Sequence, residues 1–384
     1  MKNKLTVLED KYLGGKVVKR CSLEISGESK EYYFSFDEKY KDELECEKAD
    51  AWLILLIHKM MDVGGEFFID GTISSSLLDN LERYCAFWRA WNPNYKEISI
   101  STRKEFSDEH MILPKKAIMT FSGGVDACFT LYRHSKHLAG RNNKNIEKAV
   151  FLFGADIDNE DDFQIASFKA KEQCNDCGVD LILAETNFRK LPHNWQMEHM
   201  NVCVAVLHLF KNYPFKVVSS SMDANPEYYT QYMPNSSNFV TDRYLSTSRT
   251  PLLVDDEAFT RTQKAAVIKD WKVGLKNLRV CWQGEDRSQN CGKCEKCMRT
   301  MFNFLAAGAG EIEAFDKKAY TEINSNLNNL YTPTLYFWTE IVSYSQKNRT
   351  LAGKYFDVLK SIADGKYSKK KHHSFWFHLK RGKF

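Results

Sequence analysis

The segment AIMTFSGGVDACFTLYRHSKHL, residues 117–138, places two adjacent glycines between an apolar run and a stretch of helical character. The run AIMTF, residues 117–121, predicts a short strand, and we expect a helix to begin within SGGVDA, residues 122–127. Glycines permit turns closed to other residues and let the backbone approach a phosphate closely. Backbone amides and the positive end of the helix dipole then converge on phosphate oxygens. The loop is therefore a candidate phosphate site, although it matches neither the P-loop pattern nor the dinucleotide fingerprint.

The residues of this loop suit a nucleotide. Ser122 adds a hydroxyl, whereas the Asp126 carboxylate repels phosphate and is expected to position a magnesium ion or to bond to the loop itself. A bare SGG would favour an ordinary glycine turn, but the strand before it, the helix after it and Asp126 favour nucleotide binding. The expected nucleotide-binding residues are Ser122, Gly123, Gly124, Val125, Asp126 and Ala127.

Short apolar runs alternate with helix-length stretches after residue 114. We expect strands at 117–121, 149–156, 179–187 and 215–221, and helices after the glycine loop and at 161–177 and 200–210. This alternation predicts an α/β fold, with a mostly parallel sheet and helices on both faces. Such sheets bind ligands at the carboxyl ends of their strands, where the glycine loop lies.

The length of 384 residues suggests two or three folding units. We expect a smaller α+β domain at 1–113, a nucleotide-binding domain at 114–310 and a C-terminal helical extension at 311–384. The first domain is expected to hold strands at 31–36, 64–71 and 98–100 and helices at 49–61 and 77–91. The basic, aromatic tail, residues 369–384, could contact RNA, an acidic partner or a membrane surface, or simply be a solvated end.

The composition is that of a globular chain, with 43% hydrophobic and 27% charged residues. A net charge of +4 gives no case from bulk charge for a nucleic-acid binder. No uncharged apolar run reaches the ~18 residues of a membrane span. The first residues lack an apolar signal core, so we expect a cytoplasmic protein whose 11 cysteines are reduced.

Four cysteines crowd into CWQGEDRSQNCGKCEKC, with the spacing C-x9-C-x2-C-x2-C. Four thiolates form a closed tetrahedral set for zinc, which is typical of a structural site. An iron–sulfur cluster or free thiols are the alternatives. Lys293, Lys296 and Arg299 would offset the negative charge of the thiolates. The expected zinc ligands are Cys281, Cys291, Cys294 and Cys297.

The glycine loop resembles the PP-loop motif SGGxDS of the ATP pyrophosphatase superfamily, whose HUP-like α/β members split ATP between the α and β phosphates. Ala127 stands where the motif has its final serine, so one hydroxyl ligand to phosphate is missing. The resemblance implies ATP and Mg²⁺ beside Zn²⁺, with Asp126 as a candidate catalytic residue.

The cysteine segment resembles the zinc site of 7-cyano-7-deazaguanine synthase, where a Cys-aromatic-x-Gly-Glu run precedes CGxCxxCxxR; Arg299 comes one position earlier here. The preceding TRTQKAAVIKDW, residues 260–271, resembles the lysine-bearing helix of that family. Lys264 is thereby a candidate catalytic residue that holds phosphate or pyrophosphate, with a plain surface lysine as the alternative. Related bacterial PP-loop proteins share further motifs, found here at 186–189, 278–282 and 290–301 and at Trp195 and His199.

The chain departs from that synthase after the fourth expected strand. The synthase uses an aspartate and a Tyr-Pro-Asp-Cys run to recognise its substrate, and in residues 219–239 only Asp223 has a counterpart. Asp156 and Asp158 could bind magnesium or cap the next helix. Arg189 could stabilise phosphate charge or lie on the surface.

Two further cysteine features have structural interpretations. Cys174 and Cys177 form a CxxC at the end of a helix before Gly178, which favours a structural over a redox role. Cys128 follows the loop into the helix and is expected to be a small buried residue.

These features predict an ATP-dependent ligase that adenylylates a carboxylate or amide substrate, releases pyrophosphate and AMP, and transfers the acyl group to ammonia or an amine. The resemblance implies a small-molecule acid of the 7-deazaguanine type as the substrate. Nucleobase or tRNA thiolation is an alternative. Another is a non-catalytic nucleotide-sensing subunit of a larger complex. A protein partner or acceptor and a homodimer stay open.

Overall fold

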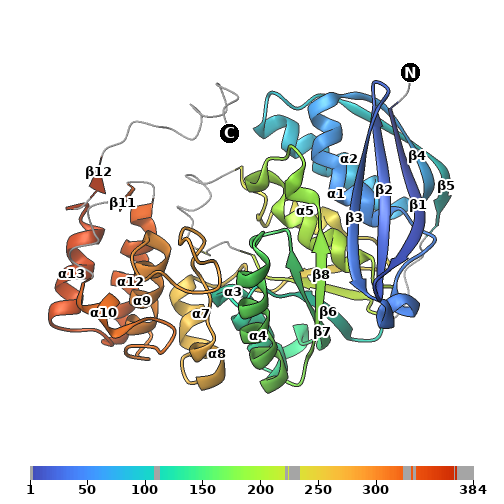
Figure 1. The fold of residues 1–384 in the computed structure, drawn as a ribbon. Coiled ribbons are helices and arrows are strands. Elements are labelled where there is room, and N and C mark those ends of the chain that lie inside the picture. The colour runs from blue at the N-terminus through green and yellow to red at the C-terminus, as the bar shows by residue number, and fades with distance from the viewer. Residues whose placement is uncertain are drawn as a thin grey trace.

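In the computed structural model, ten strands form one sheet in the order β10-β9-β6-β7-β8-β3-β2-β1-β4-β5 (Figure 1). The structure describes residues 3–107, 113–220, 224, 234–322, 330–331, 334–366 and 368–369. The sheet strands are β1 (Asn3–Leu13), β2 (Lys16–Ile25), β3 (Glu28–Asp37), β4 (Gly65–Ser74), β5 (Ile98–Phe106), β6 (Lys116–Thr120), β7 (Asn145–Phe153), β8 (Asp180–Thr186), β9 (Phe215–Val218) and β10 (Leu252–Val254).

The helices lie between and after these strands. They are α1 (Asp50–Val63), α2 (Ser75–Trp91), α3 (Val125–Ser135), α4 (Glu160–Asp176), α5 (Trp195–His208), α7 (Arg261–Ile268), α8 (Lys272–Lys276), α9 (Glu295–Ala306), α10 (Lys317–Thr321), α12 (Leu335–Asn348) and α13 (Lys354–Ala363). Short 3-10 turns occur at Glu38–Glu43, Gly140–Asn142, Phe188–Lys190 and Asp242–Leu245. A separate pair joins β11 (Leu330–Tyr331) to β12 (Ser368–Lys369).

The five strands from β10 to β8 are all parallel and carry helices on both faces, which confirms the predicted α/β class. Successive residues of a strand point to opposite faces, so the core divides in two. Ile118 and Val150 pack with α1 and α5, whereas Met119 and Phe151 pack with α3, α4, α7 and α9. The expected strands and helices of this part are present, and β10 is an additional edge strand.

The sequence predicts that the N-terminal strands form a separate smaller domain. In the structure, these strands belong to the same sheet as the parallel strands. β3 pairs antiparallel with β8, with Phe34 opposite Thr186 and Phe36 opposite Ala184. The antiparallel pairs β1–β2 and β2–β3 follow, and parallel pairs join β1 to β4 and β4 to β5. One core cluster contains α1 and α2 together with α5. The domain boundaries themselves stay predictions.

A buried polar network joins α1, α2 and α5 inside this shared core. Tyr84 donates to Asn201 Oδ1 over 3.0 Å, and His58 Nε2 lies 2.7 Å from the Tyr84 hydroxyl. Because the Tyr84 hydroxyl hydrogen is used in the bond to Asn201, His58 Nε2 must donate to the Tyr84 oxygen. A neutral imidazole carries one ring hydrogen, so His58 Nδ1 accepts from the Tyr95 hydroxyl over 2.8 Å. Buried polar groups that are all hydrogen-bonded fix a single packing of the helices.

The C-terminal helices pack beside α7 and α9, at the opposite end of the molecule from β1–β5 (Figure 1). Trp338 of α12 meets Phe302 of α9 edge to face, with ring centroids 5.6 Å apart. Among the described residues, no helix has the length and apolar content to cross a bilayer.

Acidification is expected to destabilise the protein in part through His58. Burial lowers the pKa of His58 to about 4, below the usual value of 6.5. The unfolded state therefore binds more protons between these pH values, and stability falls as the pH falls, by about 3 kcal/mol for this group. Urea unfolding of the wild type and of His58→Gln across this window measures the effect. The variant should lose less stability, and equal losses would contradict the assignment.

Candidate functional site

The glycine loop lies between the carboxyl end of β6 and the first turn of α3, as the sequence predicts. Gly123 has a φ of +73°, a conformation that suits glycine, and an added Cβ would lie 3.2 Å from Gln173 Oε1. Gly124 is the N-cap of α3 and provides no side-chain cap. The N–H groups at Val125, Asp126 and Ala127 have no intrahelical acceptor, so this end of α3 can receive an anion.

Asp126 is held by two cations from α7. Lys264 Nζ lies 3.0 Å from Asp126 Oδ1, and Arg261 lies 2.7 Å from Oδ2. Lys264 also lies 2.7 Å from Asp256 Oδ2, and its side chain is fully buried. Asp256 in turn accepts from the Ser220 amide over 2.6 Å. Lys264 is therefore a buried residue of the loop's surroundings, and the alternative of a plain surface lysine is wrong.

Burial opposes ionisation of both carboxyl groups, and their partners decide the outcome. Burial by itself would raise the pKa of Asp126, but Arg261 and Lys264 outweigh it and hold the pKa at about 2. Burial raises the pKa of Asp256 to about 7 despite its Lys264 partner. The two acids raise the pKa of Lys264 against its burial. Asp126 is therefore the ionised anchor of the cluster.

Two more cations lie near the loop. The Arg279 amide donates to Gly123 O over 2.9 Å, and its guanidinium donates to Ser122 O over 3.1 Å. Lys296, half-buried on α9, makes no ion pair within 4.0 Å among the described residues. Its pKa is lowered by burial and by the Arg261 charge. A bound anion would relieve the repulsion between Lys296 and Arg261.

The four predicted zinc ligands come together. Their sulfur atoms all lie within 4.8 Å of one another, so Cys281, Cys291, Cys294 and Cys297 could hold a metal ion such as zinc. Backbone amides face three of the sulfurs: Gly284 N lies 3.3 Å from Cys281 Sγ, Cys294 N 3.3 Å from Cys291 Sγ, and Cys297 N 3.4 Å from Cys294 Sγ. These amides would stabilise thiolates, which is the form that binds metal.

The turn of the cysteine cluster depends on Gly292. Its φ is +67°, and an added Cβ would lie 2.6 Å from Ala319 Cβ on α10. Asn290 accepts from the amides of Val280 and Cys281 and donates to Leu278 O and Ala314 O. The cluster is thus joined on one side to the segment that carries Arg279, and on the other to the region of the C-terminal helices.

The cluster is also connected to the glycine loop. Arg279 lies two residues before Cys281 and bonds to the loop backbone. Lys296 lies between Cys294 and Cys297, at the start of α9, and within electrostatic reach of Asp126. A metal at the four sulfurs would therefore fix the positions of two cations at the loop.

Other predicted residues also lie at the carboxyl edge of the sheet. Arg189 donates to Ala155 O over 2.8 Å and lies over the Trp195 ring at 5.1 Å. His199 lies 5.9 Å from Trp195, ring to ring, and its Nδ1 is 3.1 Å from Trp195 O. Burial lowers the pKa of His199. Asp156 is exposed and within electrostatic reach of His199 and Arg279.

Several alternatives from the sequence are settled by the structure. The N-cap of α4 is Asn159, which accepts from Asp162 N over 3.0 Å, so neither Asp156 nor Asp158 caps that helix. Cys174 is buried and Cys177 is half-buried at the end of α4, and their structural role stays a prediction. Cys128 and Ala127 are buried in the core beneath the loop. Asp223 and residues 370–384 of the tail lie outside the described residues.

Residues that sequence reasoning missed complete the cluster. Arg261 precedes Lys264 by three positions, so both lie on one helix face, a spacing that could have signalled a shared target. Arg279 carries no local signal, because its partner Ser122 is distant in sequence. Asp256 lies eight residues before Lys264 and outside helix α7, so no helical period indicates this contact.

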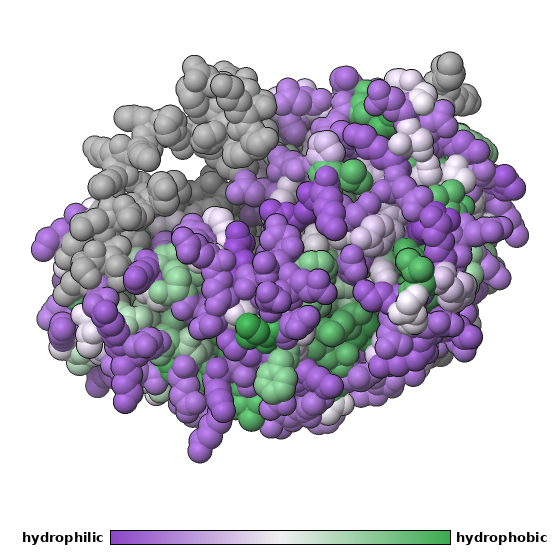
Figure 2. All heavy atoms as spheres, in the orientation of Figure 1, coloured by the Kyte–Doolittle hydropathy of each residue, from purple (hydrophilic) through white to green (hydrophobic). Residues whose placement is uncertain are grey.

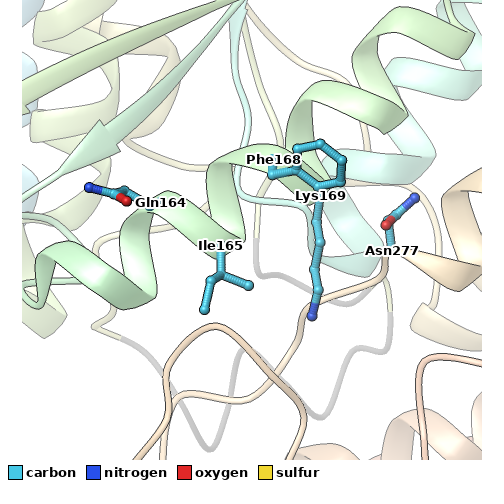
Figure 3. A pocket seen from close by; sticks show the side chains of 5 residues that line it. All are labelled: Gln164, Ile165, Phe168, Lys169 and Asn277. Carbon is cyan, nitrogen blue, oxygen red and sulfur yellow. The ribbon is translucent and has the colours of Figure 1, made fainter.

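Two cavities lie away from the loop. An open hollow of about 420 Å³ on α4 is lined by Gln164, Ile165, Phe168, Lys169 and Asn277 (Figure 3). Its Ile165 and Phe168 are exposed, on a face where scattered hydrophobic side chains lie among mostly hydrophilic ones (Figure 2). A second cavity of about 280 Å³ is lined by residues including Lys48, His208 and Arg249. Neither cavity is lined by a predicted site residue.

A scan against protein-family models, a search of curated proteins and a search of solved structures each find no match to this chain.

Replacing Cys294 by serine is expected to remove bound zinc and to lower the thermal unfolding midpoint, because three thiolates leave the tetrahedral site incomplete. Cys46→Ser is the matched control, since Cys46 is exposed and outside the cluster. Elemental analysis of the purified proteins and thermal unfolding are the measurements. Wild-type protein should carry about one zinc per chain. Equal zinc content in wild type and Cys294→Ser would contradict the site. Iron in the purified protein, together with visible absorbance, would indicate an iron–sulfur cluster at the four cysteines in place of zinc.

Proposed function

We propose that this protein is an ATP-dependent ligase of the PP-loop type, which adenylylates an acid substrate and passes the acyl group to ammonia or an amine. The observation that carries the proposal is the set of cations around the glycine loop. Arg261, Lys264, Arg279 and Lys296 come from three segments and lie close to one helix N-terminus.

The charge of this site fits a polyphosphate. Asp126 is the ionised carboxylate between Arg261 and Lys264, whereas burial favours the protonated form of Asp256. The amides at the start of α3 add positive potential. A triphosphate carries the negative charge that such an arrangement can compensate, and its oxygens can accept from both amides and side chains.

The cations suit the loss of pyrophosphate. A carboxylate oxygen of the substrate attacks the α-phosphorus of ATP, the bond to the bridging oxygen breaks, and pyrophosphate leaves with the bonding electrons. Charge grows on the leaving group, where Lys264, Arg261 and Lys296 would stabilise it. Ammonia or an amine then attacks the acyl carbon of the adenylate, AMP leaves, and the nitrogen loses a proton.

Metal ions have separate expected parts. Asp156 is an exposed carboxylate near the loop that could hold Mg²⁺, which would neutralise phosphate charge, whereas both oxygens of Asp126 already accept from Arg261 and Lys264. The four cysteines leave no open position for substrate, so zinc in this proposal shapes the site and does no chemistry. Resemblance to 7-cyano-7-deazaguanine synthase makes a 7-deazaguanine acid the first substrate to try.

A nucleotide-sensing subunit is the second candidate, because Ala127 is buried in the core and offers no hydroxyl at the position where the PP-loop motif has serine. Release of AMP and pyrophosphate from Mg-ATP distinguishes the two. The ligase predicts release that depends on 7-carboxy-7-deazaguanine or another acid together with ammonium. Tight ATP binding without AMP formation across a panel of acids would favour the sensor. Sulfur in the product would indicate thiolation.

Lys296→Met is expected to weaken Mg-ATP binding about tenfold, since it removes a half-buried cation beside the triphosphate site. Lys293→Met is the matched control, because Lys293 is exposed on the same cysteine segment. Calorimetric titration gives the affinities, and thermal unfolding and zinc content check that both variants fold. Equal weakening in the two variants, or none in Lys296→Met, would contradict a phosphate-binding role.

A further inference from the structure

Helix α7, which carries the site cations Arg261 and Lys264, is held by a carboxylate from the C-terminal helix α12. Thr260 Oγ1 donates to Glu340 Oε1 over 2.6 Å, and Thr262 Oγ1 donates to Glu340 Oε2 over 2.6 Å. Both oxygens of one side chain are thus used on the first turn of α7. The carboxylate also lies near the positive end of this helix, where negative charge is stabilised.

The threonines are themselves fixed. Thr260 is the N-cap of α7 and forms a capping box with Gln263, whose side chain accepts from Thr260 N over 2.8 Å. Thr262 is fully buried and accepts from Asn303 Nδ2 of α9 over 2.9 Å. The start of α7 is therefore bonded both to α12 and to the helix that follows the cysteine cluster.

The same turn places the two cations at Asp126. Arg261 lies between the two threonines in sequence, and Lys264 lies one turn further on. Because the helix is rigid, the orientation of its first turn determines where the side chains of Arg261 and Lys264 lie relative to the Asp126 carboxylate. A rotation or shift of α7 would lengthen the 2.7 Å contact of Arg261 with Asp126 and the 3.0 Å contact of Lys264.

Helix α12 is in turn firmly packed. Trp338, two residues before Glu340, is fully buried against Phe302 of α9. The Arg299 guanidinium lies 3.9 Å from the centre of the neighbouring Phe337 ring. Glu340 therefore projects from a fixed support.

We propose that Glu340 is a positioning residue of the nucleotide site, through which the C-terminal extension sets Arg261 and Lys264 for the triphosphate. This inference rests on the proposed function. It assigns a role to residues 334–366, which the glycine loop and the cysteine cluster do not explain.

The test compares Glu340→Ala and Glu340→Gln with Glu311→Ala and Glu311→Gln. Glu311 lies in the same C-terminal part and accepts one hydroxyl bond, from Tyr355, so it is a matched acid remote from α7. The affinity for Mg-ATP is measured by calorimetry well below the unfolding temperature. Amide hydrogen exchange is measured without nucleotide for peptides that cover α7 and residues 122–128.

Glu340→Ala is expected to bind Mg-ATP about tenfold more weakly and Glu340→Gln to be intermediate, because the amide keeps only one acceptor oxygen. Exchange at α7 and at the loop should rise in both Glu340 variants and stay at wild-type values in both Glu311 variants. Thr262→Ser should retain wild-type affinity and exchange, whereas Thr262→Val should behave like Glu340→Ala.

Unchanged exchange and affinity in Glu340→Ala would overturn the positioning role. Equal losses in the Glu340 and Glu311 variants would also overturn it, by showing only a general effect on stability. Wild-type protein that binds no Mg-ATP would defeat the proposed function. The exchange comparison would still decide whether Glu340 fixes α7 and the loop.

Discussion

The arrangement of the site depends on the ion pairs between Asp126 and the two cations of α7. Asp126 lies in the first turn after the glycine loop, and Arg261 and Lys264 come from more than a hundred residues later in the chain. A buried carboxylate needs such partners, because burial alone disfavours its charge. The ion pairs fix α7 against α3. They also hold the two cations beside the N-terminal end of α3, where the first backbone amides of that helix have no intrahelical acceptor. The same side chains that hold α7 against α3 are therefore the ones proposed to bind phosphate.

The rest of the molecule supports this contact from different sides. The parallel strands bring the loop to the carboxyl edge of the sheet, where Asp156 and Arg189 also lie. The cysteine cluster holds Arg279 and Lys296 near the loop backbone. The N-terminal strands extend the sheet from β8 on its far side, and their helices complete the core around α5. Each part therefore restricts the position of a neighbour of the loop.

The features predicted correctly from the sequence are those written in contiguous residues. The glycine loop between a strand and a helix, the alternation of strands and helices, and the closely spaced cysteines are all local patterns. The sequence does not predict strands β1 and β2, because charged residues interrupt their apolar positions, and most of β1 and alternate residues of β2 are only partly buried. The junction of β3 with β8 joins residues about 150 apart, which no local period reveals. The same reason hides Glu340, which lies about 80 residues from its partners Thr260 and Thr262.

The most direct test of the account is a calorimetric titration of Mg-ATP into the zinc-loaded wild-type protein, repeated in the presence of pyrophosphate and of adenosine. If the cations of the site bind the triphosphate, ATP should bind saturably, with about one ATP per chain. Pyrophosphate should then displace ATP far better than adenosine does. Absence of saturable binding, or displacement by adenosine alone, would contradict the claim that Arg261, Lys264 and the glycine loop form a triphosphate site.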